Sequence, residues 1–236
     1  MIKEAIILAG GFGTRLKEVI GEDIPKPMAP VNGRPFLEYI LAYLGKWGVE
    51  RVIMATGYRH EVIEAHFRDR HNDIGIAYSV EDEPLGTGGA VKKAMELVND
   101  SSPYVINGDT YFDANLWKLG NSFKAKEAEA IMALRKMGDT SRYGTVKIDP
   151  DNRITEFKEK GTQKGMGFIN GGTYILSRKT FLDLDLPDKF SLEKDYFEKY
   201  YTKQRIFGVR CYSYFLDIGI PEDYEEAADA FEGLLI

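Results

Sequence analysis

The sequence predicts one α/β domain, Rossmann-like, with a mixed and mostly parallel central sheet flanked by helices. Short apolar runs of strand length alternate along the chain with segments of helical periodicity, which is the rhythm of strand–helix–strand units. The 236 residues can bury a sizeable core, and 44% of them are hydrophobic. No repeat or flexible linker interrupts the chain. We therefore expect a single domain whose halves, 1–112 and 113–236, share one sheet with a cleft between them near 107–115.

The first half is predicted to contain four strands joined by helices. The run 5–8 is continuously apolar and predicts the first strand. In 34–48, apolar residues recur at helical spacing, which predicts a helix that ends near Gly45 or Gly48. The segment 60–67 repeats this spacing and predicts a second helix. The remaining predicted elements are strands at 51–57, 75–80 and 104–109 and a helix at 88–98.

The second half has a different pattern. Residues 143–160 read as two strands joined by a tight turn at 150–152, because apolar and polar residues alternate on both sides of that turn. The other predicted elements are a strand at 171–177, a helix at 191–201 with Ser191 as its N-cap, one or two strands at 205–219, and a closing helix with Pro221 in its first turn.

The bulk composition disfavours several classes of protein. The formal net charge of −6 argues against a nucleic-acid binder, although a few cations in a cleft can still bind phosphates. The single cysteine, Cys211, allows no internal disulfide, which fits a reducing cytosol. The first apolar run is too short for a signal peptide, and no later run approaches a membrane span. We expect a cytoplasmic protein without a membrane or nucleic-acid partner, and a homo-oligomer stays open.

The first strand runs into a glycine-rich turn, EAIILAGGFGTRL at 4–16, and turns of this kind usually hold phosphate. A dinucleotide fingerprint would need a third glycine where Leu16 stands and an acidic residue about 20 positions further on, where the chain reads PKPMAPV instead. A P-loop would need a glycine where Arg15 stands, followed by Lys and Ser or Thr. The sequence therefore disfavours an NAD-dependent oxidoreductase and excludes a P-loop.

The glycine turn and the stretch PKPMAPV together can hold a triphosphate. Flexible glycines let backbone N–H groups turn inward as an anion-binding nest. Arg15 can bind two phosphate oxygens, and Lys26 has a stiff backbone because it stands between two prolines. Taken singly, either cation could be an ordinary surface residue. The residues of the turn expected to contact the nucleotide are Leu8, Ala9, Gly10, Gly11, Gly13 and Thr14.

The motifs LAGGFGTRL and PKPMAPV resemble the signature of the sugar-1-phosphate nucleotidyltransferases. The resemblance covers essentially the whole chain, through EPLGTGGA at 83–90, NGDT at 107–110, EFKEK at 156–160, INGG at 169–172 and FLDIG at 215–219. It implies an enzyme in which a sugar 1-phosphate oxygen attacks the α-phosphorus of a nucleoside triphosphate and pyrophosphate leaves. It favours D-glycero-α-D-manno-heptose 1-phosphate as the acceptor, with mannose 1-phosphate as the alternative. A sensor domain that binds these ligands without turnover is the non-enzymatic alternative.

The same resemblance implies roles for four charged residues. Arg15 and Lys26 would be the catalytic cations, and Asp109 and Asp217 would hold Mg²⁺. Carboxylate oxygens are hard ligands that suit magnesium. Asp109 also ends a predicted strand, where an α/β sheet places ligand-binding groups. Either aspartate could instead cap a turn.

For the sugar phosphate, the resemblance implies contacts from Gly144, Glu159, Lys160, Asn170 and Gly171. Glu159 would accept hydrogen bonds from sugar hydroxyls, and Lys160 would contact the phosphate. Adjacent residues of a strand point to opposite faces, so both can reach the ligand only where the strand ends or bends. This charged run could otherwise be a solvated hairpin edge, and Asn170 a turn residue.

The stretch EDEPLGTGG at 81–89 is expected to face the nucleobase. Guanine presents two adjacent N–H donors that one carboxylate can accept, whereas uracil and thymine suit an amide better. The stretch holds three carboxylates and neither Gln nor Asn, which favours GTP over UTP or dTTP. Backbone groups near Gly86 could read the base instead. Nucleotide contacts are expected from Glu81, Glu83, Gly86, Thr87 and Asp109.

Overall fold

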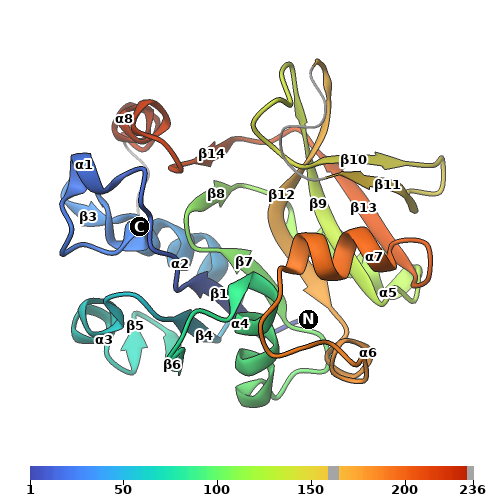
Figure 1. The fold of residues 1–236 in the computed structure, drawn as a ribbon, viewed down its shortest axis with the longest axis horizontal. Helices are drawn as coiled ribbons and strands as arrows, with labels where there is room; N and C mark the ends of the chain where they lie inside the picture. Colours follow the sequence, from blue (N-terminus) through green and yellow to red (C-terminus); the bar gives the residue numbers. More distant parts are fainter. Residues whose placement is uncertain (159–164, 233–236) are drawn as a thin grey trace.

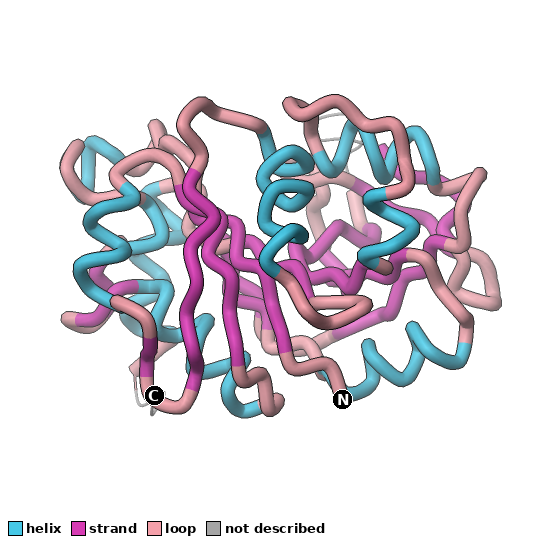
Figure 2. The backbone as a smooth tube through the Cα atoms, turned by 90° about the horizontal axis from the view of Figure 1, so that it is seen from below, coloured by secondary structure: helices cyan, strands magenta, loops and turns pink. Residues whose placement is uncertain are grey.

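The structure is a computed structural model that describes residues 1–158 and 165–232. Within these residues, ten strands form one continuous sheet that passes through both halves of the chain. Helices flank this sheet, and the first half of the chain lies beside the second with the strands running through both (Figure 1, Figure 2). The α/β class and the mixed central sheet predicted from the sequence are confirmed.

The first half supplies the parallel part of the sheet. β1 (Glu4–Ala9) lies between β4 (Arg51–Thr56) and β7 (Tyr104–Asn107) and is parallel to both. β6 (Ile74–Val80) extends this parallel order, and β5 (Arg70–His71) pairs antiparallel with it at the edge. The helices of this half are α1 (Lys17–Ile20), α2 (Phe36–Lys46), α3 (His60–Phe67) and α4 (Gly86–Ala94), with short 3₁₀ turns at Lys26–Met28 and Met95–Leu97 and a small hairpin of β2 (Pro30–Val31) and β3 (Arg34–Pro35).

β12 (Gly167–Leu176) joins the second half to the first. Its later residues pair antiparallel with β7, and its first residues pair on the same edge with β10 (Thr145–Ile148). Its other edge pairs with β9 (Ala130–Met137), which is followed in the sheet by β13 (Ile206–Cys211). The remaining elements are β11 (Ile154–Lys158), which pairs with β10, and the helices α5 (Leu116–Ala125), α6 (Arg178–Leu182), the π-turn η3 (Leu192–Phe197), α7 (Glu198–Tyr200) and α8 (Pro221–Ala230).

A second, two-stranded sheet brings together two segments far apart in the chain. β8 (Thr110–Phe112) pairs antiparallel with β14 (Phe215–Asp217), and Thr110 stands opposite Asp217 in the register. The N–H of Ile218 also donates to the carbonyl oxygen of Asp109 at 3.0 Å. This pairing sets the positions of the two aspartates that the sequence singled out.

Burial explains why these segments form these elements. Alternate residues of β1 enter two apolar clusters on opposite faces of the sheet: Ile7 belongs to one cluster and Ile6 to the other. A strand covered on both faces reads as a continuous apolar run, which is the pattern of 5–8. The helical stripe of α2 is also fully buried, with Phe36, Leu37 and Leu44 each 0% exposed.

Several details differ from the sequence-based expectations. The strand expected at 104–109 ends at Asn107, although the N–H of Gly108 still donates to the carbonyl of Leu8 in β1 at 2.9 Å. The helix at 191–201 begins as a π-turn, although Ser191 is its N-cap as predicted and accepts from the N–H of Lys194. No element was predicted between 113 and 142, where α5 and β9 lie. Within the described residues, every helix falls short of the length and hydropathy that a membrane span requires.

Candidate functional site

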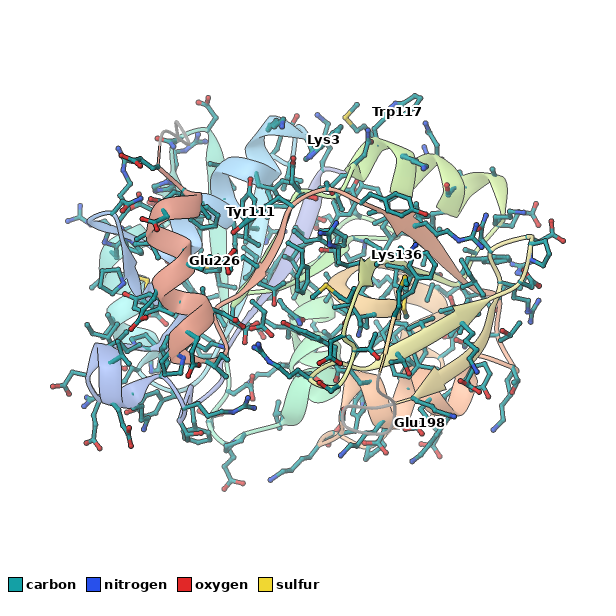
Figure 3. All side chains as sticks on the ribbon, turned by 90° about the horizontal axis from the view of Figure 1, so that it is seen from above. Lys3, Tyr111, Trp117, Lys136, Glu198 and Glu226 are labelled. Carbon is teal, nitrogen blue, oxygen red and sulfur yellow. The ribbon has the colours of Figure 1, made fainter. Side chains whose placement is uncertain are left out.

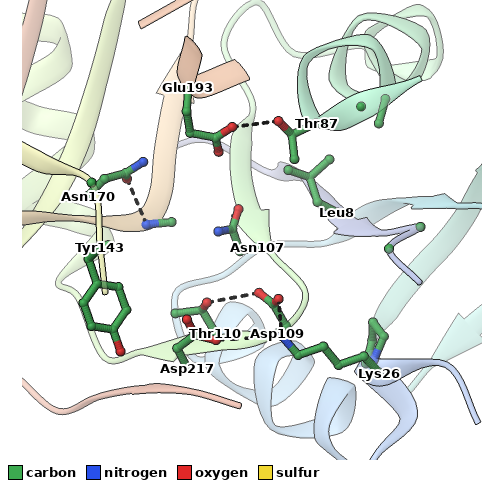
Figure 4. Close-up of a pocket in the computed structure, with 18 of the residues that line it drawn as sticks. Leu8, Lys26, Thr87, Asn107, Asp109, Thr110, Tyr143, Asn170, Glu193 and Asp217 are labelled. Atoms are coloured by element: carbon green, nitrogen blue, oxygen red, sulfur yellow. Dashed lines mark hydrogen bonds and ion pairs between the residues drawn. The ribbon is translucent and has the colours of Figure 1, made fainter. Parts of the chain in front are cut away.

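A cavity of about 500 Å³ lies between the two halves of the chain (Figure 4). Its first wall follows the carboxyl ends of β1 and β7, at Leu8, Gly10 and Asn107. Its second wall comes from the other half, with Tyr143 and Asn170. Ligands of open α/β sheets bind in the crevice at such strand ends, and this volume is typical of small-molecule sites. The cavity is therefore the candidate ligand site.

Lys26 is held at the floor of the cavity. Its Nζ donates to Oδ2 of Asp109 at 2.6 Å and lies 3.8 Å from Oδ1 of Asp217. The lysine side chain is only 12% exposed. The glycine turn packs directly behind it: Gly13 has a φ of +58°, and a Cβ built there would lie 2.7 Å from the Cβ of Lys26. A glycine at this position thus allows the turn and the lysine to approach each other.

The two aspartates reach this floor from opposite halves of the chain. Asp109 follows β7, Asp217 ends β14, and the β8–β14 pairing holds them together. The Thr110 hydroxyl donates to Oδ1 of Asp109 at 3.2 Å. Among the residues that the structure describes, no group of three or more His, Cys, Asp or Glu side chains is arranged to hold a metal ion. The two aspartates thus form a pair of carboxylates at the floor of the cavity.

Glu81 marks the end of the cavity next to the glycine turn. The backbone N–H of Leu85 donates to its Oε2 at 2.8 Å, which orients the carboxylate. Burial raises the pKa of Glu81, against smaller opposing effects of the Leu85 N–H and of Lys93. Gly86 and Thr87, at the start of α4, line the same end. Asp82 and Glu83 are exposed and do not contribute to the described lining.

The opposite end is built from a loop and a strand of the second half. The N–H of Asn170 donates to the carbonyl of Gly144 at 3.0 Å, which ties the loop to β12. The Asn170 side chain donates to the Tyr174 hydroxyl at 2.7 Å and accepts from the N–H of Gly172 at 3.1 Å. Burial and the nearby Asp217 raise the pKa of Tyr143 to about 12, so its phenol is neutral at physiological pH.

The structure brings most of the sequence-predicted residues to this cavity. Those that line it are Leu8, Gly10, Gly11, Lys26, Glu81, Gly86, Thr87, Asp109, Gly144, Asn170, Gly171 and Asp217. The predicted residues outside the described lining are Ala9, which is buried in β1, Gly13, which lies behind Lys26, and the exposed Thr14, Arg15 and Glu83. Glu159 and Lys160 lie outside the described residues.

Four polar residues of the lining were not predicted, namely Asn107, Thr110, Tyr143 and Glu193. Oδ1 of Asn107 is buried and has no hydrogen-bond partner among the described residues, which is the state of a group that a ligand satisfies. Its position in the NGDT motif was a usable signal. Glu193 lies between the two ends of the cavity, and its Oε2 accepts from the hydroxyls of Thr87 at 2.8 Å and Ser191 at 3.0 Å. Its sequence context carried no signal, since a glutamate in a helical segment reads as a solvated side chain.

The charge of the lining is unusual for a site that would bind polyphosphates. Among the described lining residues, one ammonium group, that of Lys26, faces four carboxylates, those of Glu81, Asp109, Glu193 and Asp217. Positive charge that arrives with a polyphosphate, such as that of a bound cation, would favour its binding beside these carboxylates.

Three comparisons with known proteins agree on one family. The sequence profile of the nucleotidyl transferase family matches residues 4–233. A D-glycero-alpha-D-manno-heptose 1-phosphate guanylyltransferase of Aneurinibacillus thermoaerophilus is 47% identical over 95% of this chain and 96% of its own length. The protein of the same description from Campylobacter jejuni is 48% identical over 94% of this chain and 96% of its own length.

A solved structure shares the fold closely. HddC of Yersinia pseudotuberculosis, in a complex with GMP-PN, has a TM-score of 0.86 and 40% identity, over 98% of this chain and 100% of that chain. The match of fold, the near-complete sequence coverage and the family profile confirm the resemblance that the sequence motifs indicated. The chain belongs to the nucleotidyl transferase family.

Proposed function

We propose that this chain transfers the GMP moiety of GTP to D-glycero-α-D-manno-heptose 1-phosphate and releases pyrophosphate. The observation that carries the proposal is the placement of Lys26 between Asp109 and Asp217 in a cavity shared by the two halves. The names of the Aneurinibacillus and Campylobacter relatives support the acceptor and the base. The GMP-PN complex of HddC supports a guanine nucleotide.

The reaction is a displacement at phosphorus. An oxygen of the sugar 1-phosphate attacks the α-phosphorus of GTP, a new P–O bond forms, and the bond to the β-phosphate oxygen breaks. The protein's task is to position two polyanions and to neutralise charge as it develops. Lys26 does this at the floor of the cavity, and we infer that Arg15 and the glycine turn hold the outer phosphates. Lys160 and Glu159 stay predicted contacts of the sugar phosphate.

The carboxylate pair fits a magnesium ion. Mg²⁺ in nucleotide sites is held by one or two carboxylates, and water and substrate phosphates complete its shell. Asp109 and Asp217 supply that number, and both line the cavity. When bound there, the ion would neutralise phosphate charge in the transition state. We infer that these two aspartates hold it.

We infer that Glu81 reads guanine. Its carboxylate lies at the edge of the cavity next to the glycine turn, held by the Leu85 N–H. An oriented carboxylate can accept the N1–H and N2–H of guanine together, which uracil and thymine cannot offer. Of the three acidic residues at 81–83, Glu81 alone belongs to the described lining.

The test is pyrophosphate release by the purified chain with Mg²⁺. GTP, ATP, UTP, CTP and dTTP are each paired with D-glycero-α-D-manno-heptose 1-phosphate, mannose 1-phosphate and glucose 1-phosphate. We expect the highest kcat/KM for GTP with the heptose 1-phosphate. A higher kcat/KM with mannose 1-phosphate would identify that sugar phosphate as the acceptor instead. A preference for UTP would contradict the proposed role of Glu81. Binding of GTP without turnover on any acceptor would favour a sensor.

A further inference from the structure

The C-terminal helix α8 contacts both halves of the chain. On one side, the Tyr224 hydroxyl donates to the carbonyl of Pro30, and Asn32 donates to the carbonyl of Ala228 at 2.8 Å. These contacts lie in the segment that follows Lys26. On the other side, Asp223 pairs with Arg142 of the second half. α8 thus links the lysine-bearing segment to the loop 138–144.

The Arg142–Asp223 pair is a two-point contact. Nη1 of Arg142 donates to Oδ1 of Asp223 at 3.3 Å, and Nη2 pairs with Oδ2. The aspartate side chain is 20% exposed and the arginine side chain 46% exposed. A guanidinium held by both oxygens of one carboxylate has a defined orientation, unlike a single-point surface pair. The pair therefore restrains the backbone of the loop at Arg142.

The restrained loop forms the sugar side of the cavity. Tyr143 follows Arg142 directly, and the guanidinium lies 5.6 Å from the centre of the Tyr143 ring. That ring meets Phe215 edge-on at 5.8 Å between centres. Gly144 comes next and is tied to Asn170 of β12 through its carbonyl. Tyr143, Gly144 and Asn170 all line the cavity.

We propose that the Arg142–Asp223 pair is a positioning device for the acceptor: it holds Tyr143 and Gly144 in the conformation that receives the sugar 1-phosphate. Neither residue of the pair belongs to the cavity lining. The pair acts on the sugar end, whereas Glu81, Gly86 and Thr87 at the nucleotide end have no contact with it. This role presupposes the proposed reaction, with the sugar 1-phosphate at this end.

Loss of the pair should not release α8. Phe231, just after the helix, is 1% exposed. Its ring lies 4.6 Å from that of Tyr39 and 5.0 Å from that of Tyr111. Seen from above, α8 with Glu226 lies against the first half near Tyr111 (Figure 3). The helix therefore stays docked through its aromatic end, and variants of the pair act on the loop rather than on the docking of α8.

The experiment is steady-state kinetics on the full chain, with each substrate varied in turn. In Arg142→Ala and in Asp223→Ala we expect the KM for the sugar 1-phosphate to rise about tenfold and the KM for GTP to change less than about twofold, because one two-point ion pair is lost far from the nucleotide. The double variant should be no worse than either single variant, since the residues act together. The charge-swapped variant Arg142→Asp/Asp223→Arg should recover part of the loss. Lys179→Ala, in an exposed pair with Asp183, is the matched control.

Three outcomes would overturn the positioning role. The first is an unchanged KM for the sugar 1-phosphate in both single variants. The second is an equal rise of both KM values, which would indicate general loosening of the fold. The third is a defect in Arg142→Ala that Asp223→Ala does not share, which would show that Arg142 acts without Asp223, through the Tyr143 ring or as a direct ligand. If the wild-type chain uses no sugar 1-phosphate, the proposed function fails first. Amide hydrogen exchange of 138–144 then still tests the pair: faster exchange in both variants supports restraint of the loop, and unchanged exchange refutes it.

Discussion

Lys26 and Asp109 stand 83 positions apart in the chain, yet the lysine Nζ donates to the aspartate Oδ2 at 2.6 Å. The lysine is braced from behind by Gly13, and the aspartate is held by the pairing of β8 with β14. A nucleotide phosphate bound at this floor, as we propose, would compete with Asp109 for the same ammonium group. Added positive charge at the carboxylates would release Lys26 toward the phosphate, which links the expected metal dependence to the lysine's role.

Lys26→Ala should lower kcat by at least ~100-fold, because removal of one preorganised electrostatic group at a reacting phosphate typically costs this much. Steady-state pyrophosphate release measures the effect. Lys147→Ala is the matched control, since Lys147 is 61% exposed and pairs with Glu156 on the β10–β11 hairpin. Near-normal turnover of Lys26→Ala would show that another group neutralises the phosphates.

Asp109→Asn and Asp217→Asn should each raise the Mg²⁺ concentration that gives half-maximal activity, and Asp109→Asn should lower kcat by at least ~100-fold at any Mg²⁺ concentration. A neutral amide keeps the shape of the side chain but binds Mg²⁺ more weakly than a carboxylate does. Chelation of divalent ions should abolish turnover of the wild-type chain. Asp151→Asn, at an 87% exposed side chain, is the control. If both variants kept the wild-type dependence on Mg²⁺, the two aspartates would not be the ligands of the metal ion.

The KM for GTP should rise as the pH falls from neutral to mildly acidic values. The proposed recognition of guanine needs the ionised form of Glu81. Burial raises the pKa of that carboxyl, so it takes up a proton at a higher pH than an exposed glutamate would. Glu81→Gln should have a raised KM for GTP that no longer depends on pH in this range. The exposed Glu83 lies outside the described lining, and Glu83→Gln should retain the wild-type profile. An unchanged profile in Glu81→Gln would assign base recognition to backbone groups.

Gly172→Ala should lower the free energy of unfolding by about 1–3 kcal/mol. Gly172 has a φ of +68°, and a Cβ there would lie 2.6 Å from Nδ2 of Asn107. The substitution therefore strains the backbone and displaces a side chain of the cavity, so activity should fall as well. Chemical denaturation measures the change. Gly138 has no atom within 4 Å of an added Cβ, and Gly138→Ala should stay within about 0.5 kcal/mol of the wild type. Equal stability of the two variants would contradict the close approach.

Local signals predicted the elements of the first half well, since hydrophobic periodicity is visible over a few residues. The same signals predicted Ser191 as an N-cap and Pro221 at the start of α8. They were weaker for the site. Glu193 could not be predicted from the sequence. Its place in the cavity depends on the hydroxyl of Thr87, more than 100 positions away, and on a π-helix that hydrophobic periodicity does not predict. Arg15 shows the reverse case: a strong motif predicts that it contacts the phosphates, while its side chain is exposed outside the described lining.

The amino-acid order alone determined the chemistry that is available, namely a glycine turn, a lysine between prolines and acids at strand ends, and with it the family. Tertiary structure decided which of these groups meet. Asp217 lies beside Asp109 only because β14 pairs with β8 in one register, and that register follows from burial of whole strands rather than from any local preference. The same long-range packing placed Arg142 of the loop 138–144 against Asp223 of α8, the pair for which we propose a positioning role.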